Sequence, residues 1–499
     1  MSAAVDGRTL QGQKIFDCDI VVIGSGPAGS AAARELARAG LNVIVLEAGP
    51  AVETADFPRS AYAAMTAMYR QAGMSLTVGR APLPYIQGRM VGGSSPINGA
   101  ICWRLPESVH QRWSADDPAL AQALPYHEIA SVTAELEQRL GIAPTAAAVA
   151  GPKNELMARG ADVLGWSHRP TRRNVERCTG SGRCLQGCAT ERKRSVDRTL
   201  LADAIADGAR LLSSTEAKTI VVERRRARAV WAQAAGGASI LCRAKQAIVL
   251  AASAIQTPAL LERSGIRHGP VGRNLQAHPG VSLAGYFPQL VPMWQGATQG
   301  HEVTALIAEG IKIECLGFGL GILAARLPGV GRELVENLSS LAQWLDWGAA
   351  IRAEARGRVR TVFGKTVVSY RPTAVDVARL RRGLRALGEL MFAAGATRLA
   401  PGVRGMPTYL TRRGQLRDLE RAGPRDPAAY TMAITHLFGT CRMGSAISDN
   451  VVDLNFEHQR VGRLFVADSS VFPSNIGVNP QLPIMALATI GGRRIARRC

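Results

Sequence analysis

The feature that most constrains this 499-residue chain is the stretch DIVVIGSGPAGSAAARELARAGLNVIVLEAG at positions 19–49. Residues 19–23 form a short apolar run, which is typical of a strand buried on both faces. Gly24, Gly26 and Gly29 follow with a spacing that permits a tight turn, close approach to a pyrophosphate, and packing of a helix against the strand. The succession of strand, glycine turn, helix and second strand predicts a Rossmann-like unit that binds an adenine dinucleotide.

An acidic residue closes the second strand of this unit. Residues 28–39 are rich in Ala, Leu and Arg and predict a helix, whose N-terminal amides favour an anion. Glu47 stands about 20 residues beyond the glycines, where a carboxylate accepts the ribose hydroxyls of an adenosine. It would repel a 2′-phosphate, so the sequence disfavours NADP and leaves FAD and NAD open.

The net charge of +21 raises the question of a nucleic-acid partner. The tightest basic clusters, at residues 224–226, 381–385 and 493–498, are far apart in the chain and lack interleaved aromatic residues. We therefore expect a solvated basic surface and no nucleic acid, although such a surface can attract an acidic electron-transfer partner or anionic lipid. With no apolar stretch long enough to span a bilayer and no secretion signal, the sequence predicts a cytoplasmic protein without a transmembrane segment.

Two further segments suit a cofactor. Residues 88–104, GRMVGGSSPINGAICWR, place Gly92 and Gly93 beside hydroxyls and free amides, which fits a phosphate or a planar ring as well as a plain loop. Near the C-terminus, Asn479 and Pro480 have the residue types of an N-cap and a first helical position. The N-terminus of that helix, if aimed at a flavin, would stabilise negative charge on the reduced ring.

His436 lies in an apolar setting, AITHLFGT, between a predicted strand and a glycine loop. A histidine in such surroundings is often a core residue. A neutral imidazole that faces an alcohol hydroxyl would instead act as a general base near neutral pH. The residues alone leave both interpretations open.

Three of the nine cysteines form a motif. Cys178, Cys184 and Cys188 have the spacing C-x5-C-x3-C in a Gly-rich loop flanked by arginines. Clustered thiolates can ligate an iron–sulfur cluster, whose charge the arginines would offset. Zinc would require a fourth ligand, for which His168 is the nearby candidate. The third alternative is a set of reduced cysteines without a metal.

Six segments, taken in order, resemble the glucose–methanol–choline (GMC) flavoprotein oxidoreductases over nearly the whole chain. They are residues 19–49, 88–104, 247–266 (AIVLAASAIQTPALLERSGI), 271–279 (VGRNLQAHP), 436–444 (HLFGTCRMG) and 466–488 (VADSSVFPSNIGVNPQLPIMALA). The resemblance implies a mixed α/β (α+β composite) fold, with a Rossmann-like FAD-binding domain and a β-sheet-based substrate domain. We expect the FAD-binding domain at residues 1–280, with a cysteine-motif insertion at about 170–200, and the substrate domain at residues 281–429. Residues 430–499 would return to the first domain with the active-site residues.

The same resemblance implies roles for individual residues. His436 would be the base and Asn479 its partner at the substrate oxygen. The residues expected to contact FAD are Gly24, Gly26, Gly29, Glu47, Gly92, Gly93, Ser94, Asn98, Asp468 and Pro480. Family members with covalent FAD attach it through a histidine in the GGSS loop, where this chain has Ile97, so we expect non-covalent FAD.

The function implied is oxidation of a primary or secondary alcohol to an aldehyde or ketone, with hydride transfer to flavin N5. The cysteine spacing resembles the 3Fe–4S segment of bacterial FAD-dependent glucose dehydrogenases, and such a cluster would pass electrons to a cytochrome or quinone. The apolar 281–429 segment, with Trp294, Trp344 and Trp347, favours an apolar or aromatic alcohol. The alternatives are a non-redox FAD-containing lyase of the same fold and an NAD(P)H-dependent flavin monooxygenase.

Overall fold

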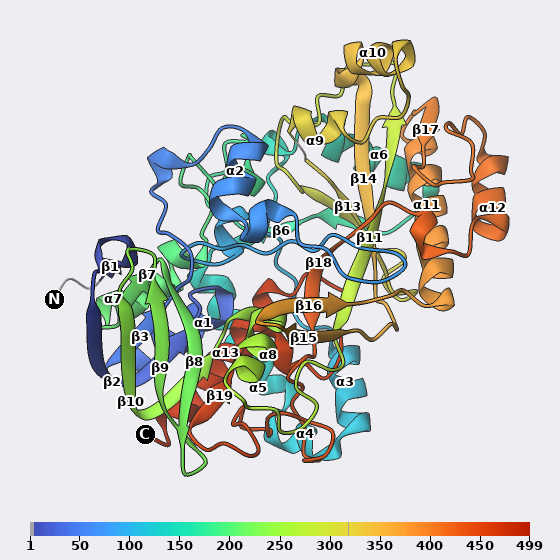
Figure 1. Cartoon of the computed structure of the whole chain (residues 1–499). Coiled ribbons are helices and arrows are strands. Elements are labelled where there is room, and N and C mark those ends of the chain that lie inside the picture. Colours follow the sequence, from blue (N-terminus) through green and yellow to red (C-terminus); the bar gives the residue numbers. More distant parts are fainter. Residues whose placement is uncertain (1–3, 318) are drawn as a thin grey trace.

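Two sheets organise this computed structural model, which describes residues 4–317 and 319–499 (Figure 1). The first is an 8-stranded sheet with its strands in the order β1 (Ala4–Asp6), β7 (Arg210–Ser213), β3 (Val43–Leu46), β2 (Gln13–Ile23), β10 (Ser239–Leu250), β9 (Arg226–Ala234) and β8 (Thr215–Glu223), while β19 (Leu464–Val466) pairs with β10. The second is a 7-stranded sheet in the order β17 (Arg398–Ala400), β11 (Gln276–Tyr286), β14 (Trp344–Ile351), β13 (Ile311–Cys315), β12 (His301–Val303) and β5 (His168–Pro170), while β18 (Met432–Phe438) pairs with β11. The predicted mixed α/β architecture is confirmed.

Helices cover both sheets. They are α1 (Pro27–Arg38), α2 (Ala61–Met68), α3 (Glu107–Asp116), α4 (Pro118–Ala123), α5 (Tyr126–Arg139), α6 (Pro152–Leu164), α7 (Leu200–Ala206), α8 (Ser253–Arg263), α9 (Leu320–Ala324), α10 (Arg332–Ser339), α11 (Ala374–Ala393), α12 (Arg413–Ala422) and α13 (Gln481–Ala496). Two 2-stranded antiparallel sheets complete the chain, β15 (Arg358–Val362) with β16 (Lys365–Ser369) and β4 (Ile142–Pro144) with β6 (Arg172–Asn174). No helix of the described residues is long and apolar enough to cross a membrane.

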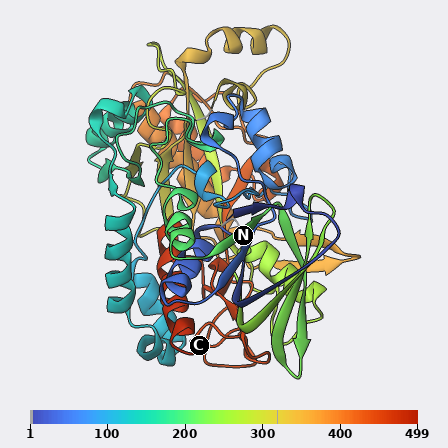
Figure 2. The same ribbon diagram turned by 90° about the vertical axis from the view of Figure 1, so that its left-hand side faces the viewer.

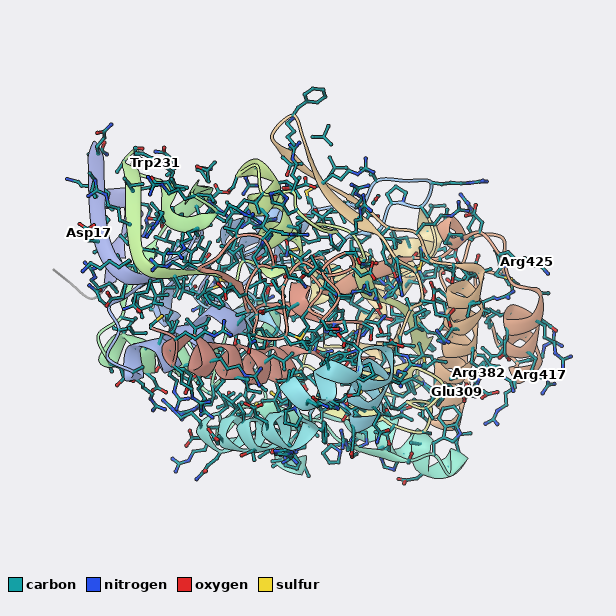
Figure 3. All side chains as sticks on the ribbon, turned by 90° about the horizontal axis from the view of Figure 1, so that it is seen from below. Asp17, Trp231, Glu309, Arg382, Arg417 and Arg425 are labelled. Carbon is teal, nitrogen blue, oxygen red and sulfur yellow. The ribbon has the colours of Figure 1, made fainter. Side chains whose placement is uncertain are left out.

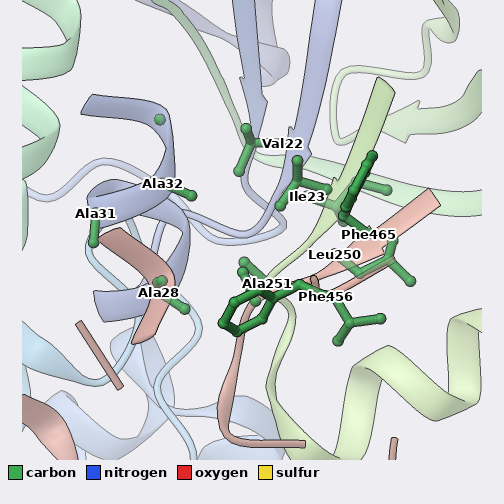
Figure 4. Packing of buried hydrophobic residues seen from close by; sticks show 14 of the residues in the cluster. Val22, Ile23, Ala28, Ala31, Ala32, Leu250, Ala251, Phe456 and Phe465 are labelled. Carbon is green, nitrogen blue, oxygen red and sulfur yellow. The ribbon is translucent and has the colours of Figure 1, made fainter. Parts of the chain in front are cut away.

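The first sheet has the predicted parallel core. β2 pairs in parallel with both β3 and β10, and α1 provides the crossover from β2 to β3. The small side chains Ala28, Ala31 and Ala32 of α1 belong to the same buried cluster as Val22 of β2 (Figure 4). α13 runs beside α1 (Figure 2), and a side chain at Gly492 would meet the Cα of Ala32 at 3.1 Å. These small residues therefore let the two helices approach closely.

Two predictions for the second half of the chain are wrong in detail. The sequence pattern of residues 331–354 predicts a helix, but α10 ends at Ser339 and β14 begins at Trp344. β14 is buried along nearly its whole length, and a strand covered on both faces loses the period-2 alternation by which strands are recognised. The pattern of residues 303–308 predicts a strand, but β12 ends at Val303. Residues 152–164 and 375–394 have the pattern of helices, and the structure confirms them as α6 and α11.

The expected domain boundaries do not coincide with the ends of elements. Position 280 lies inside β11, and residues 430–499 contribute β18 to the second sheet but β19 and α13 to the first. The division into domains stays a prediction.

Charged side chains on the outer surface come from separate elements. Figure 3 shows Arg382, Arg417 and Arg425 near one end of the molecule and Asp17 near the other. Arg382 forms an ion pair with Glu309 at 3.1 Å, so acidic residues lie among these arginines. The expectation of a solvated basic surface, without nucleic acid, stays a prediction.

Candidate active site

A cavity of about 600 Å³ is lined by residues of both sheets. One end is formed by the turn between β2 and α1, including Gly24 and Gly26. The other end is formed by strands of the second sheet, including Gly280 of β11 and His436 of β18. Every residue that the sequence assigned to FAD, except Gly29 and Gly92, lines this cavity.

The glycines at the first end leave room that side chains would fill. Gly24 has φ +101°, and a Cβ on Gly29 would overlap the Gly24 carbonyl oxygen. A Cβ on Gly93 would lie 2.8 Å from the Cα of Gly26, so the 88–104 loop packs against the glycine turn. These contacts require glycine and leave backbone exposed to a ligand, as a pyrophosphate requires.

Glu47 anchors the same turn. Its Oε2 accepts hydrogen bonds from the Ser25 amide at 3.0 Å and the Ser25 hydroxyl at 2.8 Å, and its Oε1 accepts one from the Gly49 amide at 2.8 Å. The Gly92 amide donates to Ser25 Oγ at 3.0 Å, which joins the two glycine-containing loops. The carboxylate is buried at the cavity wall, and Oε1, which accepts one hydrogen bond, has a lone pair left for a ribose hydroxyl.

Asp468 is buried where β19 ends. It accepts hydrogen bonds from the Ser470 amide at 2.8 Å, the Ser253 amide at 2.9 Å and the Thr257 hydroxyl. Burial raises the pKa of the Asp468 carboxyl, while these hydrogen bonds oppose the rise. Asp468 thereby fixes the start of α8 beside the cavity.

Ser94 and Asn98 also hold the loop in place. The Ser94 hydroxyl accepts from the Gly88 amide at 2.9 Å. The Asn98 side chain donates to Gln481 Oε1 at 2.6 Å and accepts from the Ala100 amide at 2.9 Å. The loop is thus tied to the first residue of α13.

His436 faces a second histidine at the other end of the cavity. Nδ1 of His436 lies 3.2 Å from Nδ1 of His278, and the Gly477 amide donates to Nε2 of His278 at 2.9 Å. Burial and the charge of Lys312 lower the pKa of His436 to about 3. Burial and the neighbouring His436 hold the pKa of His278 well below its usual value. Both imidazoles are therefore neutral near pH 7.

Asn479 completes this end with an uncommitted side chain. It is buried, it lines the cavity, and its Oδ1 has no hydrogen-bond partner within the described residues. The N-cap expected at Asn479 is wrong, because α13 begins at Gln481 and Pro480 occupies the cap position without a side-chain hydrogen bond. A buried amide oxygen without a partner requires an explanation, and a ligand in the cavity provides one.

The three motif cysteines do not converge. Within residues 4–317 and 319–499, no three His, Cys, Asp or Glu side chains form a group that could hold a metal ion. Cys178 Sγ accepts from the Gly180 amide at 3.4 Å, and Cys188 Sγ lies 3.5 Å from the Thr190 hydroxyl. The arrangement described here therefore does not fit an iron–sulfur cluster held by Cys178, Cys184 and Cys188.

His168 is engaged elsewhere. Its Nδ1 lies 2.8 Å from Nε2 of His301, and its Nε2 lies 2.9 Å from Oδ1 of Asp162. Both ring nitrogens are occupied, so His168 does not serve the cysteines as a zinc ligand in this structure.

The sequence interpretation missed several residues of the cavity wall. His278 lies in the segment 271–279, which carried the resemblance but received no role. Glu314 and Arg326 also line the cavity, and nothing in the local pattern of an amphipathic strand or a short helix distinguishes them. The substrate-domain tryptophans do not line the cavity, so they give no reason to expect an apolar or aromatic substrate; they are Trp294, Trp344 and Trp347.

Comparison with known families decides the affiliation of the chain. Two GMC oxidoreductase family profiles match residues 65–280 and 353–488, and a pyridine nucleotide-disulphide oxidoreductase profile matches residues 18–94. An uncharacterized GMC-type oxidoreductase of Mycobacterium tuberculosis (strain ATCC 25618 / H37Rv) is 36% identical over 477 residues, which cover 94% of this chain and 74% of the relative. The chain belongs to the GMC oxidoreductase family. It is an oxidoreductase and a flavoprotein, as the resemblance implied.

Other relatives support membership of the GMC family. A GMC-type oxidoreductase of Sinorhizobium fredii (strain NBRC 101917 / NGR234) is 34% identical over 502 residues, covering 97% of this chain and 95% of the relative. A long-chain-alcohol oxidase of Arabidopsis thaliana is 27% identical over 518 residues, covering 96% and 68% respectively. The crystal structure of pyridoxine 4-oxidase from Mesorbium loti superposes with a TM-score of 0.72 at 21% identity, over 95% of this chain and 98% of that chain, which shows a shared fold.

The residues present fit FAD. The glycine turn offers bare backbone, Glu47 offers a carboxylate beside it, and the same cavity continues to His436 and Asn479. A cofactor that extends from the turn to the histidine pair would bring its reactive ring to the catalytic end.

Proposed function

We propose that this GMC oxidoreductase oxidises an alcohol to an aldehyde or ketone with non-covalently bound FAD. The observation that carries the proposal is that His436, a neutral imidazole, and Asn479, whose amide oxygen has no partner among the described residues, line the same cavity. A reacting hydroxyl needs one group to receive its proton and another to hold its oxygen, and these two side chains can supply both.

FAD, when bound, supplies a hydride acceptor, and the residues of the chain do the rest. Nδ1 of His436 is engaged with His278, so Nε2 is the ring nitrogen that meets the alcohol hydroxyl. Asn479 orients the oxygen through its amide.

The hydrogen bonds of the histidine pair set a condition on this role. The Gly477 amide can only donate, so a neutral His278 carries its proton on Nδ1 and directs it at Nδ1 of His436. His436 then carries its own proton on Nε2. Nε2 can receive the alcohol proton only after the His436 proton has moved to Nδ1, and that tautomer requires the Nδ1–Nδ1 contact with His278 to open, since both nitrogens would then carry a proton. We therefore expect the resting enzyme to bind the alcohol through an N–H donor before the proton moves.

Non-covalent attachment follows from the residue at position 97. Ile97 is buried and has no nucleophilic atom, so FAD should be released when the enzyme is denatured. The electron acceptor, whether oxygen, a cytochrome or a quinone, is not assigned by any group in the cavity.

Anaerobic titration tests the proposal. A panel of primary and secondary alcohols is mixed with the FAD-loaded enzyme, and flavin absorbance is followed; bleaching by at least one alcohol is expected. Bleaching by NAD(P)H alone would instead identify the monooxygenase alternative. A flavin that no alcohol bleaches, in an enzyme that cleaves cyanohydrins, would identify the lyase alternative.

A further inference from the structure

The cavity floor carries a second polar cluster, away from the histidine pair. Ser282 on β11 and Glu314 on β13 both line the cavity, and both pair in register with Gly348 on β14 between them. Neighbouring strands lie about 4.8 Å apart, so these two side chains stand on one row about 10 Å apart. Gly348 also lines the cavity, and a Cβ there would meet the Leu316 side chain at 3.2 Å. Because glycine has no side chain, no atoms project into the cavity between Ser282 and Glu314 at this position.

Arg326 completes this cluster from the segment that follows α9. Its guanidinium donates to the Ser282 hydroxyl, and its Nε lies 3.5 Å from Oδ2 of Asp346, which also accepts from Ser282 at 3.0 Å. A guanidinium has five N–H groups, more than these contacts use. The Arg326 side chain is 26% exposed and lines the cavity, so donors remain available to a ligand.

Glu314 forms the opposite side and is itself neutralised. Its Oε2 accepts from Lys312 at 2.6 Å, and Lys312 also lies 3.1 Å from Glu302, which pairs with Arg169 at 2.8 Å. Each carboxylate in this network therefore has a cation beside it, as Asp346 has Arg326. Ser282, Arg326 and Glu314 therefore offer strong hydrogen-bond donors and acceptors but no uncompensated charge.

The pairing of charges around Arg326 and Glu314 determines which chemical group this cluster can bind. A carboxylate would be attracted by Arg326 but repelled by Glu314, and an ammonium group would meet the reverse. A hydroxyl can accept from Arg326 or donate to Glu314 without adding a charge to a partly buried site. An uncharged hydroxyl is the group that suits both sides.

The floor also defines a distance. His278, Gly280 and Ser282 follow one another at every second position of β11, and all three line the cavity. Successive residues of a strand rise about 3.3 Å, which places Ser282 about 13 Å from His278. The floor between them is formed by small residues, including Ala350 and Ala433, that offer a ligand no charged group.

We propose that Ser282, Arg326 and Glu314 bind a second hydroxyl at the far end of the substrate. The preferred substrates are then elongated alcohols that carry an uncharged hydroxyl about eight to ten bonds from the reacting carbon, with an apolar middle. This substrate class rests on the alcohol oxidation proposed above.

Four alcohols of equal length test the substrate class. The full-length FAD-loaded enzyme is mixed anaerobically with 1-octanol, 1,8-octanediol, 8-hydroxyoctanoate or 8-amino-1-octanol, and the dissociation constant is taken from the flavin reduction rate against concentration. We expect the diol to bind about tenfold more tightly than 1-octanol, which exceeds the twofold statistical advantage of two equivalent ends, since a hydrogen bond to a charged group has this magnitude. The two charged alcohols should bind no more tightly than 1-octanol.

Variants test which residues cause the tighter binding of the diol. Arg326→Met and Glu314→Gln should each remove most of the diol preference, so that the dissociation constants of 1,8-octanediol and 1-octanol become similar. Ser282→Ala, which leaves Arg326 beside Asp346, replaces Arg326→Met if that variant fails to fold. Glu309→Gln, at the surface ion pair with Arg382, is the control and should keep the preference.

Equal binding of 1-octanol and the diol to the wild type would overturn the substrate class while leaving alcohol oxidation intact. A diol preference that survives in the Arg326, Glu314 and Ser282 variants would overturn the assignment of these residues. Failure of every alcohol in the wider panel to bleach the flavin would instead overturn the proposed function, and the far-end site with it.

Discussion

The two ends of the cavity are built from different kinds of chain segment. At the dinucleotide end, the glycine turn and Glu47 come from one stretch of about thirty residues, and their polar groups bond to one another, as Ser25 does with Glu47. At the catalytic end, His278, His436 and Asn479 come from three distant segments. There the Asn479 amide oxygen has no partner within the described chain.

The difference follows from what each end has to do. An end that only holds a cofactor can complete most of its hydrogen bonds internally, and it gains rigidity from them. An end that engages a reacting oxygen must keep polar atoms uncommitted until the substrate arrives, at a cost in stability. Variants at the two ends should therefore separate flavin binding from flavin reduction.

Replacement of His436 gives the largest expected effect on reduction. His436→Ala should lower the anaerobic flavin reduction rate by about 10²–10⁴-fold, since it removes the proton acceptor, while FAD content stays near that of the wild type. His127→Ala, on the exposed side of α5, is the matched control. Unchanged reduction by alcohol in His436→Ala would exclude this residue as the base.

Replacement of Gly29 should produce the reverse pattern. In Gly29→Ala the new Cβ overlaps the Gly24 carbonyl, so we expect loss of most bound flavin and a fall of about 3 kcal/mol in the free energy of unfolding. Gly414→Ala is the control, because its Cβ would meet only Arg417 at 4.0 Å. Purified Gly29→Ala with full flavin content and an unaltered melting temperature would contradict the claim that the glycine turn determines flavin binding.

Asn479 should affect rate with little effect on stability. Since its Oδ1 makes no hydrogen bond in the described chain, Asn479→Ala should change the free energy of unfolding by less than about 1 kcal/mol. We expect reduction by alcohol to slow about 10–100-fold, as a group holding the reacting oxygen is lost. A large drop in melting temperature with unaltered reduction would assign Asn479 a structural role instead.

Acid should destabilise the catalytic end in particular. The pKa of His436 in the folded enzyme is about 3, below the usual 6.5, so the unfolded chain binds the proton first as pH falls below about 6.5. The stability contributed by this neutral histidine is present above about pH 6.5 and is lost progressively towards pH 3, at up to about 1.4 kcal/mol per pH unit. Thermal melting from pH 7.5 to 5 should be less steep with pH in His436→Asn than in the wild type, and parallel curves would contradict the burial of a neutral imidazole.

The cysteine loop should show the smallest effect. Because the motif thiols do not form a ligand group in the described structure, we expect no stoichiometric iron or acid-labile sulfide in anaerobically purified enzyme. Cys184→Ser should leave flavin content and the reduction rate within about twofold of the wild type. Three or four iron atoms per chain, lost in Cys184→Ser, would show that metal binding rearranges this loop.

Prediction from sequence succeeded where the determining contacts are local. The glycine turn, α1 and Glu47 were predictable because a strand, a tight turn and a helix N-terminus follow one another in the chain. β14 was predicted as a helix because a strand buried on both faces has no period-2 pattern. The Asn479 N-cap was wrong because an Asn-Pro pair signals a helix start whether or not the amide is used for capping.

The sequence by itself determined that this chain contains a Rossmann-like unit with Glu47 at its edge, and the family-like segments pointed to His436. Only the tertiary structure decided which side chains share the catalytic end with it. His278 reaches His436 because β11 and β18 are neighbours in the second sheet, and Ser282 and Glu314 flank Gly348 because β14 lies between their strands. These relations depend on strand order and register, which arise from long-range pairing and leave no mark in the local pattern of residues.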